Sequence, residues 1–143
     1  MYDYLVPFSF AWMVVAALLG LRLGVASIKY ARRIDDIANS GDLAAYHAES
    51  KAFLWQKTVH AHTFLFSVVG AVIFFTLGHH VTATSLKDLI AGAVMVAAVL
   101  WPMAALRESR PLMGVADILF LLAIAACGAS LFLPSDMRWW GAG

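Results

Sequence analysis

Charged side chains are scarce in this sequence. Only 13% of the 143 residues are Asp, Glu, Lys or Arg, and the formal net charge is +1, whereas a soluble domain has about 25% charged residues. A chain of this size could not cover a mean hydropathy of +0.80 with a polar surface. The composition excludes a soluble enzyme and a disordered chain, and the small net charge provides no field for binding nucleic acid.

Cysteine is nearly absent as well. The single Cys127 excludes an internal disulfide and a zinc site built from cysteines. The apolar runs are continuous and lack the alternation of barrel strands. The first run has no basic start, carries Asp3 and is too long for a cleavable signal peptide. What remains is an all-α integral membrane protein.

Four apolar stretches are present, at residues 5–30, 53–78, 86–106 and 112–133. Each reaches the roughly 20 residues that a helix needs to cross the hydrocarbon core of a bilayer. Short connections make consecutive helices antiparallel neighbours, and no linker divides the chain. We therefore expect residues 1–143 to form one transmembrane domain, an antiparallel four-helix bundle.

Basic residues gather in two of the three connections. They are Lys29, Arg32, Arg33, Lys51 and Lys57 between the first two stretches, and Arg107 and Arg110 between the last two. The other side holds only Lys87 and Arg138. By the positive-inside rule the two basic loops are cytoplasmic and both termini lie outside. We expect a multi-pass protein of the bacterial inner membrane.

The first cytoplasmic connection contains a turn signal, Asn39-Ser40-Gly41-Asp42, that ends in a candidate helix N-cap. Helix-forming residues flank the turn, so the first two helices are expected to project from the membrane as a hairpin. Folding about the turn brings Arg32 or Arg33 near Glu49. An exposed pair of this kind stabilises a protein by at most about 1 kcal/mol.

Four ionisable residues fall within the predicted spans at one depth. Arg22, His60, His62 and Asp117 lie on three different stretches, each about 10 Å inside the cytoplasmic boundary at 1.5 Å per residue. An ionisable group in hydrocarbon is costly and marks a functional candidate. We predict that Arg22 and Asp117 set the local charge and relay protons. The alternatives are an ion pair with no further role, or an Arg22 side chain that reaches the headgroups.

The two histidines are predicted to point to nearly opposite faces of their helix, because successive helical residues turn by about 100°. They therefore cannot easily bind one metal ion from one helix, as a His-Glu-x-x-His motif does. The His60 face contains small residues such as Ser67, which suits close helix packing. The His62 face contains Phe66 and Ile73. Its bulk predicts contact with lipid, a second subunit or a bound cofactor.

The segment Val59-His60-Ala61-His62, followed by an apolar run with Gly70, resembles the His-x-His helix of haem-copper oxidase subunit I and of small bacterial four-helix membrane proteins related to it. The resemblance covers a short part of the chain. It implies that His60 and His62 are ligands of b-type haem, because imidazole is an axial ligand of haem iron. Two imidazoles that point oppositely from one helix can ligate two haems, or one haem on one side and a second partner on the other. The oxidases carry further ligand histidines on other helices, whereas here the remaining histidines are His47, His79 and His80. A complete copper–haem oxygen site is not supported.

A haem at this site would be five-coordinate, would use Met103 or Met113, or would be shared across a symmetric interface between copies of the chain. Arg22, Lys29 and Arg107 would then meet the haem propionates near the cytoplasmic surface. A quinone near the membrane face is a further candidate ligand. The competing interpretation is that both histidines are uncoordinated and hydrogen-bonded.

The leading hypothesis is a small membrane electron-transfer protein of a respiratory chain, with haem b, or a subunit of such a complex. No residue is predicted to be catalytic. The second hypothesis is a non-catalytic accessory subunit of a larger respiratory or transport complex. The third is a proton- or ion-translocating homo-oligomer with a polar path through Arg22, His60, His62 and Asp117. All three place the chain in a lipid bilayer, within a homo-oligomer or a larger complex.

Overall fold

The computed structural model describes residues 1–81 and 84–132, which are helical almost throughout. A 3-10 helix η1 (Tyr2–Tyr4) leads into α1 (Leu5–Ser40), α2 (Leu43–His80), α3 (Thr84–Leu106) and α4 (Arg110–Phe132). All four α-helices are long and apolar enough to cross a membrane. The all-helical prediction is thereby confirmed, and the four candidate spans indicate a multi-pass membrane protein.

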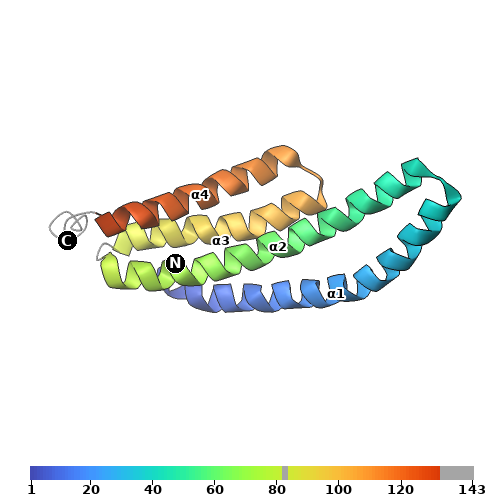
Figure 1. The fold of residues 1–143 in the computed structure, drawn as a ribbon. Helices are drawn as coiled ribbons and strands as arrows, with labels where there is room; N and C mark the ends of the chain where they lie inside the picture. Colours follow the sequence, from blue (N-terminus) through green and yellow to red (C-terminus); the bar gives the residue numbers. More distant parts are fainter. Residues whose placement is uncertain (82–83, 133–143) are drawn as a thin grey trace.

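The first two helices are longer than the last two. α1 has 36 residues and α3 has 23, which correspond to about 54 and 35 Å at 1.5 Å per residue. The turn between α1 and α2 therefore lies well beyond the connection between α3 and α4 (Figure 1). The predicted stretches 5–30 and 53–78 lie within α1 and α2. Those at 86–106 and 112–133 match α3 and α4 to within two residues at the ends that the structure describes.

The turn between α1 and α2 has the predicted chemistry. Gly41 adopts a left-handed conformation with φ +73°, which costs glycine little because it has no Cβ. The Asp42 side chain caps α2 by accepting a hydrogen bond from the backbone N–H of Ala45 at 2.9 Å. Arg33 Nε lies 3.4 Å from Glu49 Oε2. The predicted turn, cap and ion pair are therefore confirmed.

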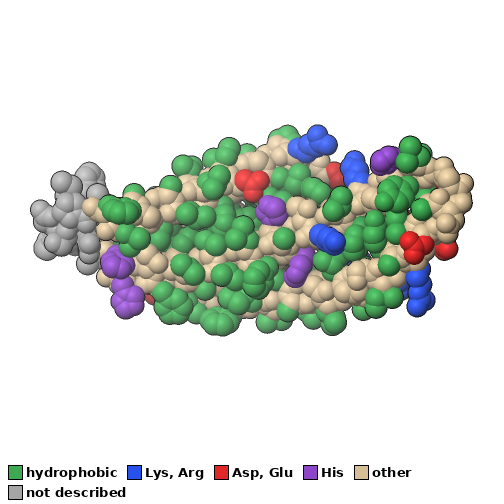
Figure 2. Space-filling model, in the orientation of Figure 1, with side chains coloured by type: hydrophobic (Ala, Val, Ile, Leu, Met, Phe, Trp, Pro, Cys, Tyr) green, Lys and Arg blue, Asp and Glu red, His purple; other side chains and the backbone are tan. Residues whose placement is uncertain are grey.

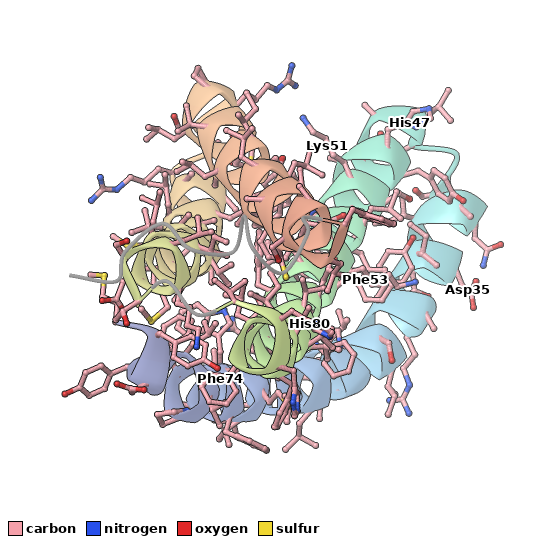
Figure 3. All side chains as sticks on the ribbon, turned by 90° about the vertical axis from the view of Figure 1, so that its left-hand side faces the viewer. Asp35, His47, Lys51, Phe53, Phe74 and His80 are labelled. Carbon is pink, nitrogen blue, oxygen red and sulfur yellow. The ribbon has the colours of Figure 1, made fainter. Side chains whose placement is uncertain are left out.

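α1 and α2 extend beyond the α3–α4 connection, and aromatic side chains pack between them near the start of this extension. The rings of Tyr30 and Phe53 stack with centroids 4.1 Å apart. In Figure 3, Phe53 lies between the two helices, whereas Asp35, His47 and Lys51 point away from them. The extension is thus held together by an apolar contact between the two helices, and charged side chains such as Asp35 and Lys51 point outward (Figure 3).

The four α-helices pack side by side, with α1 and α4 on opposite sides of α2 and α3 (Figures 1 and 3). The core is built mainly from α2, α3 and α4, and includes Phe66, Ile73, Leu77, Val94, Trp101 and Phe120. On the face drawn in Figure 2, Lys and Arg side chains lie over the half that holds the α1–α2 turn and the α3–α4 connection.

The prediction for the His62 face of α2 was wrong in one respect. Phe66, Ile73 and Leu77 on this face retain at most 3% of their exposed surface, so the face belongs to the core and not to lipid or a second subunit. The reason is that a membrane helix is apolar all round, and bulk alone does not distinguish a core face from a lipid face.

Candidate functional site

His60 lies in the contact between α1 and α2. A Cβ atom at position 20 would come within 2.9 Å of His60 Cε1 and 3.3 Å of His60 Nε2. The imidazole therefore rests on the bare backbone of Gly20, and a larger residue there would push it away. His60 Nδ1 is buried and has no hydrogen-bond partner among the described residues. The ring fills a helix–helix contact, with one polar atom left unsatisfied.

His62 faces the other way and lies between α2 and α3. Its ring stacks on that of Trp101, with centroids 4.0 Å apart and planes 8° apart. Its Nδ1 lies 3.0 Å from the backbone oxygen of Thr58. A carbonyl oxygen can only accept, so Nδ1 carries the proton and donates it. In the neutral ring Nε2 is then unprotonated and presents a lone pair.

Further aromatic side chains surround the His62 stack. Trp55 lies beside Trp101 with centroids 6.3 Å apart, and Phe66 meets Phe120 of α4 edge to face at 4.4 Å. Trp101 is 3% exposed, and its indole N–H has no acceptor among the described residues. His62 is therefore held in an apolar setting built from three helices.

Sequence reasoning placed His60 and His62 on opposite faces but did not find their partners. Gly20 and Trp101 are distant from the histidines in sequence, and only the helix pairing brings them together. A signal was present for Gly20, since a glycine inside a membrane helix often marks a close contact. Trp101 offers no such signal, because a tryptophan in a membrane helix can face lipid as well as a neighbouring helix.

Arg22 and Asp117 are not brought together. Arg22 is exposed on α1 and Asp117 is half-buried on α4, and these helices lie on opposite sides of the molecule (Figure 1). The ion pairs among residues 1–81 and 84–132 join the Met1 ammonium to Asp88 and Arg33 to Glu49. An ion pair between Arg22 and Asp117 of the same chain is therefore absent from this arrangement.

The four predicted depth residues nonetheless lie within about 8 Å of one another along the bundle. Gly20 beside Arg22 meets His60. Trp101 meets His62. Phe120 lies about one helical turn after Asp117, and Phe66 lies about one turn after His62. These two rings meet edge to face. These contacts tie all four helices together over this stretch.

The other candidate ligands lie elsewhere or have different environments. Met103 is 49% exposed, and Met113 packs partly buried against the core. His79 and His80 are exposed at the end of α2, and His47 is exposed near its start. Within the part of the chain that the structure describes, no three His, Cys, Asp or Glu side chains gather closely enough to hold a metal ion.

Comparisons with known proteins do not assign a family. No protein-family model, no curated protein and no solved structure matches this chain.

Proposed function

We propose that the chain is a membrane electron-transfer protein, or a subunit of an electron-transfer complex, that binds a b-type haem through His62. One observation carries this proposal. His62 donates its Nδ1 proton to the Thr58 carbonyl and so keeps a lone pair on Nε2. A hydrogen bond of this type fixes the orientation of a ligating histidine and raises its basicity.

The surroundings of His62 suit a haem in two respects. The stack on Trp101 fixes the plane of the imidazole, and the neighbouring side chains are apolar, which favours a hydrophobic macrocycle. When bound, a haem supplies one-electron transfer. His62 would hold such a group, and the aromatic side chains of Trp101 and Trp55 would orient it.

His60 fits the same role poorly in this arrangement. Its Nε2 lies against the backbone of Gly20, which leaves no room for a porphyrin plane around that nitrogen. His60 could serve as an axial ligand only if α1 moved away from α2. We therefore propose that His62 would hold the haem, and that Met113 or a residue of another copy of the chain would supply a further ligand.

The proposed orientation follows the distribution of Lys and Arg. The α1–α2 turn and the α3–α4 connection carry most of the basic residues, so both are proposed to be cytoplasmic. The membrane is then proposed to be the bacterial inner membrane, with the long α1–α2 hairpin projecting into the cytoplasm.

The test is an absorbance spectrum of the protein purified in mild detergent, with iron analysis of the same sample. The wild type is expected to show a reduced-minus-oxidised haem band, and His62→Ala is expected to abolish it. His47→Ala is the matched control, because His47 is exposed outside the site, and it should retain the band. Circular dichroism and size-exclusion elution confirm that each variant is folded.

Two outcomes would contradict the proposal. A colourless, iron-free wild type would remove the haem, and co-purification of stoichiometric partner proteins would then favour an accessory subunit. A folded His62→Ala variant with an unchanged haem band would show that His62 is not the ligand.

A further inference from the structure

Two charged side chains that lie more than four residues from either end of a predicted span are left without an ion-pair partner among the described residues. Arg22 on α1 is exposed, and Asp117 on α4 is half-buried. Neither takes part in the two ion pairs present in residues 1–81 and 84–132. Charged groups at membrane depth are rare and almost always pair with one another or face water. Both positions therefore require an explanation outside the single chain.

A movement of side chains within one chain cannot join them. α1 and α4 are separated by the layer that contains α2 and α3 (Figures 1 and 3). Packed helices lie about 8–10 Å apart between axes, so two such spacings exceed the combined reach of the two side chains. Arg22 and Asp117 therefore belong to helices on different sides of the bundle.

Contact with lipid headgroups does not explain both Arg22 and Asp117 either. A long Arg22 side chain can extend toward the membrane surface. Asp117 lies seven residues after Arg110 at the start of α4, which is about 10 Å along the helix. An aspartate side chain is much shorter than this distance, so Asp117 requires a partner at its own depth.

We propose that copies of this chain associate side by side in the membrane, with Arg22 of one copy paired to Asp117 of the next. The two residues have opposite charge, and the contacts of their helices with α2 place them about five residues, or about 8 Å, apart along the bundle, a distance that the long Arg22 side chain can span. Each lies beside exposed apolar residues that can pack around the ion pair. Those residues are Leu18 and Val25 on α1, and Ile118 and Leu121 on α4.

The arrangement has a definite symmetry. Because α1 and α4 lie on opposite sides of one chain, each copy offers a basic surface to one neighbour and an acidic surface to another. Such a head-to-tail interface generates a closed ring when the rotation between copies closes. The inference stands independently of haem binding, since it rests on Arg22 and Asp117 and not on His62.

The test is disulfide trapping in native membranes with both charges intact. In a Cys127→Ala background, Leu18→Cys and Leu121→Cys place thiols on the exposed surfaces of α1 and α4. Both positions are four residues from the charges, on the side away from the cytoplasmic connections, and each is 62% exposed. Mild oxidation is expected to give a ladder of linked dimers, trimers and higher species. Either cysteine alone should give none.

Two matched variants establish the register and the role of the charges. Val25→Cys replaces Leu18→Cys on nearly the same face of α1 and is also exposed, but it lies about 10 Å closer to the α1–α2 turn. This moves the thiol further from the level of Leu121, so trapping is expected to fall at least fivefold. Adding Asp117→Asn to the Leu18→Cys, Leu121→Cys chain should also reduce it at least fivefold. Helical content and membrane insertion are compared for every variant.

Three results would overturn the proposal. The first is no intermolecular product from the Leu18→Cys, Leu121→Cys chain. The second is equal trapping by Leu18→Cys alone, which would indicate a face-to-face α1 dimer. The third is unchanged trapping after Asp117→Asn in a folded, inserted chain. If Asp117→Asn fails to insert, the exchanged pair Arg22→Asp with Asp117→Arg must restore the ladder, and its absence there counts equally against the proposal.

Discussion

His60 and His62 belong to the same helix and lie at nearly the same depth, but the structure gives them different environments. His60 rests on Gly20 of α1 and leaves Nδ1 buried without a partner. His62 stacks on Trp101 of α3 and donates from Nδ1 to the Thr58 carbonyl. The first imidazole acts as a space-filling group in a helix contact. The His62 ring is oriented by its stack on Trp101 and by its hydrogen bond to Thr58, and its Nε2 keeps a lone pair.

The difference shows that the neighbours of a histidine, and not its position in a motif, determine its chemistry. A His-x-His spacing places two rings on opposite faces. Which face meets a glycine and which meets a tryptophan depends on the helices that pack there. The proton position on the His62 ring follows from its contact with Thr58, because the hydrogen bond made by one nitrogen decides what the other can do.

The largest expected effect comes from removing the ring beneath His62. Trp101→Ala deletes a buried aromatic side chain and should lower the free energy of unfolding by about 3–5 kcal/mol. Trp55→Ala is the control, since Trp55 is only half-buried, and its cost should be clearly smaller. Denaturation in mixed detergent micelles, followed by circular dichroism, measures both. Equal losses in the free energy of unfolding would mean that Trp101 contributes no more to stability than the half-buried Trp55.

The contact beneath His60 is tested by adding volume. A Cβ at Gly20 would lie 2.9 Å from His60, whereas one at Gly24 would meet nothing within 4 Å. Gly20→Leu should therefore cost about 1–3 kcal/mol through overpacking, and Gly24→Leu should change the free energy of unfolding little. The same denaturation measures them. A neutral Gly20→Leu would show that α1 does not pack closely on His60.

Replacing each histidine by leucine compares the two rings directly. His62→Leu loses the hydrogen bond to Thr58 and the stack on Trp101, and should cost about 1–2 kcal/mol. His60→Leu removes a buried nitrogen that already lacks a partner, so its cost should be smaller, below about 1 kcal/mol. Denaturation midpoints of the two variants are compared with the wild type. The reverse order would refute the assigned environments.

The smallest effect is expected on the projecting hairpin, away from both histidines. The Arg33 side chain is 68% exposed and pairs with Glu49 at 3.4 Å, so Glu49→Gln should cost less than about 1 kcal/mol. Raising the salt concentration should reduce the difference further, because exposed charges are screened. A large, salt-independent loss would mean that the hairpin contributes more to the fold than its exposure indicates.

Much of the fold follows from the sequence because membrane helices are encoded locally. Continuous apolar runs give the spans, and Gly41 and Asp42 give the turn and the cap between α1 and α2. The site was predicted only in part. The opposite faces of His60 and His62 follow from helical geometry, but Trp101 as a partner depends on which helix packs against α2.

The wrong expectation about the His62 face has the same origin. Phe66 and Ile73 are as apolar as lipid-facing residues, and in a membrane both surroundings are apolar. Arg22 and Asp117 illustrate a further limit. Their similar depth can be read from the sequence, whereas their placement on opposite sides of the bundle requires the three-dimensional arrangement.

The position of the ring proton on His62 tests the account most directly. Nitrogen NMR of protein labelled with ¹⁵N-histidine and free of added haem distinguishes a protonated from an unprotonated ring nitrogen, and His62→Ala assigns the signal. The bond to Thr58 predicts that Nδ1 of His62 carries a proton, which makes Nε2 the unprotonated nitrogen of the neutral ring. A His62 that carries its proton on Nε2 would contradict the account, because that nitrogen could not then act as a ligand.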